Sequence, residues 1–306
     1  MKNCIEVPFT KLHGLGNDFI VTSWTMIDRD SRRNTKITLL HSMVGNMRSL
    51  ARLARAICHR QTGVGADGFL LVMPPRLRGH DARVRFFNAD GSEAEMSGNG
   101  IRCAAACLRE YDPRKVSLKL ETLAGVKELD CLKEERGRWI FRVAMGHPIL
   151  DPQKIPFRAR NISPPVLAYP LSTSQGKQCA TITSMGNPHC SLFVPDFEQV
   201  DWKAIGRELE VHPHFPNRTN VEFVKVISRR EIEVRFWERG VGQTASSGTG
   251  SCAAAVASIL NGYTGRRVRV KTVAGPLEID WPEGGSVRLT GPAQRIASGV
   301  YEYSPN

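Results

Sequence analysis

The chain has 306 residues, of which 41% are hydrophobic, and this is long enough for two domains that each bury a core. It has no apolar run of about 18 residues, and Met1–Glu6 lacks the apolar stretch of a signal peptide, so we expect a cytoplasmic protein without a membrane-spanning helix. The net charge of +12 suggests nucleic-acid binding only weakly, and because aromatic residues are not interleaved with the basic ones, we expect no nucleic-acid partner.

Strand-like runs alternate with short helices in the first half of the chain. Two strands are expected to pair around the glycine turn His13–Gly16, and Met47–Arg60 predicts an amphipathic helix with a solvated basic face. The basic residues of that face are Arg48, Arg52, Arg55 and Arg60. The other elements expected here are strands at Pro8–Lys11, Phe19–Thr22, Gly68–Met73, Arg83–Asn88, Val116–Thr122, Val126–Leu132 and Trp139–Val143, and an alanine-rich helix at Ile101–Tyr111.

The second half repeats this alternation. Asp151–Pro165 is rich in proline and polar residues and is predicted to connect two domains. The expected elements are strands at Cys179–Thr183, Ser191–Val194, Val221–Val226, Glu231–Trp237, Arg267–Val273, Leu277–Asp280 and Ser286–Thr290, and a helix at Ala253–Asn261.

The eight cysteines are scattered and form no CxxC pair, so we interpret them as reduced thiols that pack as small hydrophobic residues. Cys103 and Cys107 lie four residues apart on an expected helix, a spacing that two metal ligands can have. No His or Asp nearby completes a ligand set, so two buried thiols are the favoured interpretation and no metal site is expected.

One pattern occurs twice. Asn88 and Glu238 end expected strands, and nine residues after each comes a serine, Ser97 or Ser247, that opens a Ser-Gly-x-Gly turn before an alanine-rich helix. Two copies predict two similar halves related by a pseudo-twofold axis, each with one such turn facing a shared cleft.

The repeated turn favours an anionic ligand. Glycines before a helix let the backbone approach a ligand closely, and the free N–H groups of the first turn then point at it. A carboxylate or an enolate-like species suits such a site. A thiol at the start of the turn would be driven toward thiolate and could act as a base, whereas a serine hydroxyl gains much less because an alcohol is far less acidic.

These motifs, together with others in the same order along nearly the whole chain, resemble those of the diaminopimelate epimerase family. The segments that carry the resemblance are Lys11–Phe19 (KLHGLGNDF), Gly63–Gly68 (GVGADG), Phe87–Cys103, Gly186–His189 (GNPH), Thr219–Glu222 (TNVE) and Glu238–Ala255.

The resemblance implies an α/β (α+β) fold of two pseudo-symmetric domains, each a strand layer or barrel around a central helix. The N-terminal domain would comprise 1–141 with 293–306, because the C-terminal tail returns to it, and the C-terminal domain would comprise 142–292. The family works without cofactor or metal, and the resemblance implies a homodimer. One base removes the α-proton of LL-2,6-diaminopimelate and its partner returns a proton on the other face, giving the meso form for lysine and peptidoglycan precursor synthesis. The two base positions correspond to Ser97 and Ser247.

The resemblance also implies the remaining site residues of a small diamino dicarboxylic acid ligand. Glu238 and Arg239 match the family's pair near the reacting amine and the distal carboxylate, and His189 and Glu238 match the polar supports beside the two bases. The contacts to the distal amino-acid head are Asn17, Asn88, Asn187 and Asn220. The donors to the reacting carboxylate are Gly98, Asn99, Gly248 and Thr249.

The sequence departs from the family at both bases, where the family has cysteine. Cys103 and Cys252 lie a turn or more further along their helices and are poor substitutes. The segment 21–47 is longer than usual, which suggests an insertion. Four interpretations stay open: an epimerase slowed by its serines, a pair of substitutions introduced to hold substrate without turnover, an isomerase or racemase that acts on another substrate, and an amino-acid-binding relative without catalysis.

Overall fold

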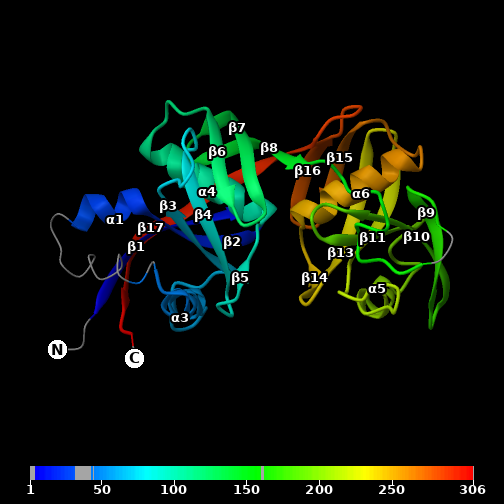
Figure 1. The fold of residues 1–306 in the computed structure, drawn as a ribbon, viewed down its shortest axis with the longest axis horizontal. Helices are drawn as coiled ribbons and strands as arrows, with labels where there is room; N and C mark the ends of the chain where they lie inside the picture. Colours follow the sequence, from blue (N-terminus) through cyan, green and yellow to red (C-terminus); the bar gives the residue numbers. More distant parts are fainter. Residues whose placement is uncertain (1–3, 32–42, 44, 160–161, 306) are drawn as a thin grey trace. The chain divides into compact units, whose positions relative to one another are not determined.

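A computed structural model describes residues 4–31, 43, 45–159 and 162–305 (Figure 1). The chain divides into two compact units, Met1–Val143 with Pro292–Asn306 and Ala144–Gly291. Both transitions occur inside strands, β8 (Arg138–Gly146) and β17 (Val287–Tyr303). The proline-rich stretch Asp151–Pro165 therefore belongs to the second unit, and the prediction that it connects the domains is wrong.

The first unit is a closed ring of eight strands. Its C-terminal strand β17 pairs with β1 and β8 and closes the ring, which confirms the expected strand layer. The short strand β5 (Glu93–Ala94) pairs with β4 beside the ring. The other strands, in pairing order, are β1 (Ile5–Gly14), β2 (Asn17–Ser23), β3 (Gly68–Met73), β4 (Ala82–Asn88), β6 (Ser117–Thr122) and β7 (Gly125–Glu135).

Helix α4 (Gly98–Tyr111) lies inside this ring and contacts β1, β2, β3 and β4. Its residues Ile101 and Cys103–Cys107 are fully buried, and alanine suits them because only small side chains let strands approach a helix from several sides. Helix α1 (Trp24–Ser31) packs against β1, β2 and β3, and helix α3 (Met47–Cys58) packs against β3 and β4. The predicted basic face of α3 is confirmed for Arg48, Arg52 and Arg55, which are exposed while Leu50, Leu53 and Ile57 are buried. Arg60 lies beyond the end of the helix and donates to Asp18 and Asp67 instead.

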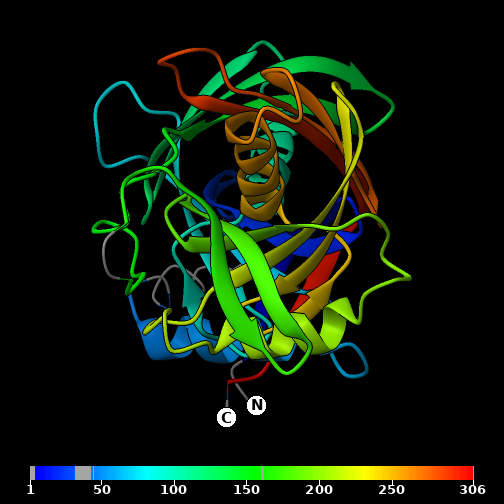
Figure 2. The same cartoon turned by 90° about the vertical axis from the view of Figure 1, so that its right-hand side faces the viewer.

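The second unit repeats this arrangement around helix α6 (Gly248–Leu260), which Figure 2 shows in the middle of its strands. Helix α5 (Trp202–Glu210) packs against β9, β12 and β13. The strands are β9 (Val166–Thr173), β10 (Gly176–Ser184), β11 (Pro188–Phe193), β12 (Asn220–Ser228), β13 (Glu231–Glu238), β14 (Gly242–Thr244), β15 (Arg267–Thr272) and β16 (Gly275–Asp280).

The strand pairings confirm the internal repeat. In the first unit β2–β3 and β4–β6 are parallel, and in the second unit β11–β12 and β13–β15 are parallel at the same places in the order. The second parallel pair of each unit is connected through its central helix, as parallel strands require a crossover. By these pairings, β2, β3 and β4 of the first unit correspond to β11, β12 and β13 of the second unit.

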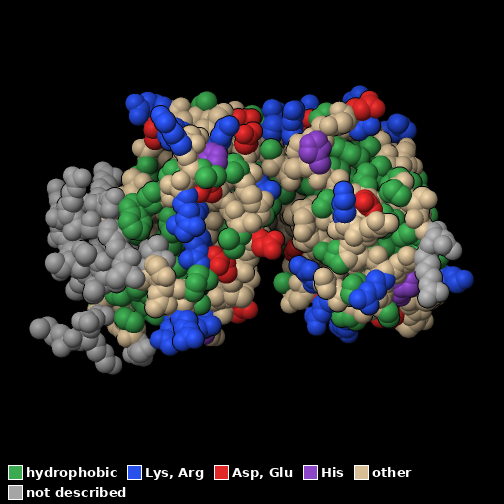
Figure 3. All heavy atoms as spheres, viewed as in Figure 1, with side chains coloured by type: hydrophobic (Ala, Val, Ile, Leu, Met, Phe, Trp, Pro, Cys, Tyr) green, Lys and Arg blue, Asp and Glu red, His purple; other side chains and the backbone are tan. Residues whose placement is uncertain are grey.

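Among the described elements, five were absent from the sequence prediction: helices α1 and α5 and strands β5, β9 and β14. The long segment 21–47 is in part helix α1, but residues 32–42 and 44 of it lie outside the described residues. Among the described residues, no helix is long and apolar enough to span a bilayer. On the face drawn in Figure 3, Lys and Arg side chains lie in separate groups with other residue types between them.

Candidate functional site

The first serine turn stands at the start of α4. Ser97 is the N-cap of this helix, with φ −130° and ψ 126°, and its Oγ accepts a hydrogen bond from Gly100 N at 3.1 Å. A serine in this position stabilises a helix by about 1 kcal/mol. The first N–H groups of α4, from Gly98 and Asn99, have no acceptor within the helix itself and are the natural donors to an anion.

A chain of side-chain hydrogen bonds orients the amides beside this turn. Asn17 donates from Nδ2 to Asp67 Oδ2 at 2.8 Å and accepts at Oδ1 from Asn99 Nδ2 at 3.3 Å. Asn99 Oδ1 in turn accepts from Arg102 Nη2 at 2.7 Å. Arg102 is fully buried and also donates to the carbonyl oxygens of Gly98 and Pro292. The structure therefore brings Asn17 and Asn99 together.

The turn between β1 and β2 places Asn17. Leu15 and Gly16 form a two-residue hairpin loop with φ values of 52° and 80°, as the loop of a tight hairpin requires. Asn88, at the end of β4, is exposed, and its Nδ2 donates to Ser92 Oγ at 2.9 Å. Its side chain has no hydrogen bond to Asn17 or Asn99 in the described chain.

The second serine turn matches the first in backbone but differs in its partner. Ser247 is the N-cap of α6, with φ −134° and ψ 126°, and its Oγ accepts from Gly250 N at 3.3 Å. The same hydroxyl donates to Glu238 Oε2 at 2.8 Å, while Glu238 Oε1 accepts from Thr244 Oγ1 at 2.6 Å. Ser247 is 5% exposed. The structure thus places two predicted site residues, Glu238 and Ser247, in direct contact.

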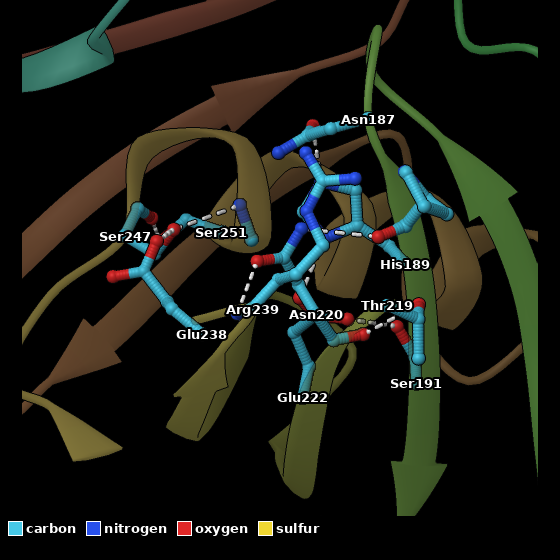
Figure 4. A network of polar contacts seen from close by, with 12 residues as sticks. Asn187, His189, Ser191, Thr219, Asn220, Glu222, Glu238, Arg239, Ser247 and Ser251 are labelled. Carbon is cyan, nitrogen blue, oxygen red and sulfur yellow. Dashed lines mark hydrogen bonds and ion pairs between the residues drawn. The ribbon is translucent and has the colours of Figure 1, made fainter. Parts of the chain in front are cut away.

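A buried polar pair lies on the neighbouring strands of the second unit (Figure 4). His189 Nδ1 on β11 lies 2.6 Å from Glu222 Oε1 on β12, and both side chains are essentially without solvent exposure. His189 Nε2 lies 2.9 Å from Asn187 Oδ1, and Ser191 Oγ donates to Glu222 Oε2 at 3.2 Å. Burial raises the pKa of Glu222, and the nearby charge of Glu238 adds to that rise, whereas His189 opposes it.

Asn220 holds the backbone at the site. Its Nδ2 donates to Pro188 O at 3.0 Å, and its Oδ1 accepts from Arg239 N at 3.0 Å. Arg239 is exposed, and its Nη1 donates to Asn217 O at 3.2 Å. Asn220 therefore positions Arg239, which keeps donors available for a ligand.

Sequence reasoning missed Asp67, Arg102, Ser191 and Glu222. A signal for two of them was present: Glu222 interrupts the apolar strand Val221–Val224, and Arg102 interrupts an otherwise small and apolar helix. A charged residue in such a run is buried and needs a partner. Asp67 carried no comparable signal, because it lies in a polar turn.

The cysteines of α4 are not substitutes for a base. Burial raises the pKa of Cys103 to about 12, although the charge of Arg102 opposes the rise, and burial also raises the pKa of Cys107. Every cysteine is a free thiol. The described residues contain no cluster of His, Cys, Asp or Glu arranged to hold a metal.

Comparison with solved structures finds the same fold in an epimerase and in an isomerase. A hydroxyproline epimerase from Agrobacterium vitis matches with a TM-score of 0.68 at 14% identity, covering 100% of this chain and 95% of that one. A methylitaconate-delta-isomerase matches with a TM-score of 0.63 at 13% identity, covering 98% and 96%. At such identities the likeness concerns the fold alone.

The chain belongs to the diaminopimelate epimerase family. The model of that family matches residues 9–150 and 181–296. The diaminopimelate epimerase of Pelotomaculum thermopropionicum is 46% identical over 298 residues, which cover 96% of this chain and 99% of that protein. That of Desulfitobacterium hafniense is 43% identical over 293 residues, covering 95% and 96%. The resemblance predicted from the sequence motifs is confirmed.

Proposed function

We propose that this chain binds LL-2,6-diaminopimelate and converts it to the meso form without a cofactor. The observation that carries the proposal is the pair of serine turns: Ser97 and Ser247 cap buried helices with the same backbone conformation and the same hydrogen bond to a glycine three residues on. Membership of the family supports diaminopimelate as the substrate.

The two halves have complementary tasks in this proposal. By family resemblance, the domain 1–141 with 293–306 would supply position 97 to one face of the ligand's α-carbon, and the domain 142–292 would supply position 247 to the other face. Gly98, Asn99, Gly248 and Thr249 would donate to the reacting carboxylate. Arg239 and the asparagines, including Asn88, would bind the distal head, with Asn220 acting by holding Arg239 in place.

Serine at both base positions limits the chemistry. Removal of an α-proton needs a group that is deprotonated near neutral pH, and an alcohol at a helix N-terminus is not. The contact of Ser247 with Glu238 supplies a proton acceptor for one hydroxyl. We therefore infer slow turnover, in a cytoplasmic homodimer as the family resemblance suggests.

A second candidate is binding of the same ligand without turnover. It is favoured by one observation: the polar contacts around both serines are in place while neither serine is a thiol. Exchange of the α-proton of diaminopimelate in heavy water separates the two candidates. Exchange with epimerisation supports the enzyme, and saturable binding with no exchange over days supports the binding protein.

A further inference from the structure

The pair formed by His189 and Glu222 has no counterpart in the first unit. The register of the strands aligns Glu222 in β12 with Leu70 in β3, and His189 in β11 with Phe19 in β2. Leu70 and Phe19 are both buried. In the first unit two apolar side chains occupy these positions, so the fold itself does not need a polar pair there.

A buried polar pair is an expensive replacement for an apolar one, since both groups lose their hydration. Glu222 lies deep: a Cβ added at Gly250, in the first turn of α6, would meet its Oε1 at 3.1 Å. The pair therefore lies directly beneath the turn that Ser247 opens. This placement points to a role at the ligand site rather than in stability.

The contacts of the pair lead outward to Asn187. His189 is fully buried, whereas Asn187 is half-buried and its Oδ1 faces His189 Nε2 at 2.9 Å. Within the described chain, Nδ2 of Asn187 makes no hydrogen bond. The protonation of His189 Nε2 therefore decides which end of the Asn187 amide faces a ligand. A protonated Nε2 donates to Oδ1 of Asn187 and leaves the N–H₂ group pointing outward, whereas an unprotonated Nε2 accepts from the N–H₂ group and leaves the oxygen pointing outward.

The number of protons shared by His189 and Glu222 decides whether Nε2 of His189 carries a proton. One proton between a carboxylate and Nδ1 leaves a bare Nε2 and a net negative charge in a buried site, which is unfavourable. Two protons make the pair neutral and place one on Nε2, wherever the other lies along the 2.6 Å contact. Burial raises the pKa of Glu222, which agrees with retention of the second proton.

We propose that Glu222 is a positioning residue: together with His189 it holds two protons, so that His189 Nε2–H binds Asn187 Oδ1 and the amide N–H₂ of Asn187 faces a ligand carboxylate. The choice of ligand rests on the proposed function. The protonation of the His189 ring and the orientation of the Asn187 amide do not depend on the proposed function.

The first test uses the unaltered protein with ¹⁵N-labelled histidine. The signals of His189 are assigned by their loss in His189→Gln, and their ¹⁵N shifts and coupling to hydrogen show which ring nitrogens carry protons. We expect a protonated Nε2 at pH 7. A bare Nε2 at that pH overturns the proposal, and because no ligand is needed, this outcome is independent of whether the chain binds diaminopimelate.

The second test measures binding of diaminopimelate by calorimetry. Glu222→Gln is isosteric with a protonated Glu222: its amide can donate to Nδ1 while its oxygen accepts from Ser191, so Nε2 keeps its proton and the affinity should stay within about twofold. Glu222→Leu introduces the residue that Leu70 provides in the first unit, and loss of the fixed amide should weaken binding roughly tenfold, about 1.4 kcal/mol.

Ser258→Ala is the control, since it removes a fully buried hydroxyl of α6 that binds Ala254 O away from the turn, and it should leave affinity unchanged. Equal losses in Glu222→Gln and Glu222→Leu would show that the carboxylate charge matters instead, and equal affinity in all three variants would show that Glu222 does not position Asn187. Either result contradicts the proposal. Absence of binding in the unaltered protein contradicts the proposed function and leaves the proton on Nε2 to be decided by the first test.

Discussion

Ser247 donates its hydroxyl hydrogen to Glu238 at 2.8 Å, whereas the residue that matches Glu238 in the first unit, Asn88, turns its amide to Ser92. The two serine turns therefore share a backbone but have different electrostatic surroundings. Next to Ser247 is a carboxylate. Next to Ser97 is a chain of amides that leads to the buried guanidinium of Arg102.

Replacing both serines with cysteine should raise epimerisation of diaminopimelate by at least roughly several hundredfold, because a thiol at a helix N-terminus supplies a thiolate near neutral pH. Each single change should help less, since a proton is removed on one face and returned on the other. The measurement is α-proton exchange and epimerisation in heavy water for the unaltered chain, Ser97→Cys, Ser247→Cys and the double variant.

Two outcomes would contradict this account of the bases. One is turnover by the unaltered chain at a rate typical of a working epimerase, which would require Ser97 and Ser247 to be activated by Glu238, His189 or another group. The other is a double variant that binds diaminopimelate but exchanges no proton. The site would then have diverged beyond its bases.

The two single variants should also differ in thiol acidity. A thiol at position 247 lies beside the carboxylate of Glu238, which opposes a second negative charge, so its pKa should exceed that of a thiol at position 97 by about one unit. The rate of alkylation against pH, followed peptide by peptide in the mass spectrometer, gives both values. Adding Glu238→Gln to Ser247→Cys should remove most of the difference, and a thiol at position 97 with the higher pKa would show that the carboxylate does not control the contrast.

The repeated turn is the part of the site that the sequence predicts best, because everything that defines it is local. Ser97 and Ser247 need only the glycines that follow them and the alanine-rich helix behind them. The same holds for α3, whose apolar residues recur at helical spacing. The predicted starts of α4 and α6 were late because the Gly-x-Gly residues are poor helix formers, yet they are the first turn in each case.

Contacts between distant residues could not be predicted in this way. His189 and Glu222 meet only because β11 and β12 pair in parallel with one particular register, and the sequence pattern did not reveal that register across the helix that separates the two strands. Helix α5 was missed for a related reason. It has only nine residues and contains a glycine, so its stability comes from packing on the β12–β13 surface.

Gly206 in α5 shows how tight that packing is. A Cβ at this position would meet Trp237 Cβ at 2.8 Å and Cγ at 2.9 Å. Gly206→Ala should therefore destabilise the protein by about 1–3 kcal/mol, despite the higher helix propensity of alanine. Gly265→Ala is the matched control, because its Cβ would meet only Arg229 O at 3.7 Å, and its effect should stay within about 0.5 kcal/mol. Urea denaturation measures both, and equal stability of the two variants would contradict the packing argument.

Asp18 should link stability to pH. Burial opposes its ionisation, but hydrogen bonds from Arg60 and Lys11 outweigh this effect and hold the pKa of Asp18 below its usual value. A lowered pKa means that the ionised form stabilises the fold above the unfolded-state value of about 3.9, and that this stability is lost as the pH falls through the folded-state pKa.

Asp18→Asn should therefore lower the urea midpoint at pH 7, and the difference from the unaltered chain should shrink as the pH falls below about 4. Asp112→Asn is the control, because Asp112 pairs with the exposed Arg114 and solvent screens that pair. A difference between Asp18→Asn and the unaltered chain that persists undiminished at the lowest accessible pH would show that Asp18 acts through hydrogen bonding alone.

Ligand preference tests the two ends of the proposed site together. The turn of α4, with Asn99 held between Asn17 and Arg102, suits one carboxylate, and the exposed guanidinium of Arg239 suits another. A ligand with an amino-acid head at each end should engage both. We expect diaminopimelate to bind at least roughly tenfold more tightly than lysine, which lacks the second carboxylate, or glutamate, which lacks the second amine.

Variants at the two ends give this preference its internal control. Arg239→Leu should weaken the binding of diaminopimelate more than that of lysine, because of these two ligands only diaminopimelate has a distal carboxylate to lose. Asn99→Ala should weaken all three ligands, since each has the amino-acid head that the turn would bind. Calorimetry with the three ligands and the two variants tests both ends. Lysine or glutamate binding as tightly as diaminopimelate would contradict the assignment of the distal end. An Arg239→Leu variant that loses affinity equally for all three ligands would show that Arg239 binds the reacting carboxylate and not the distal one.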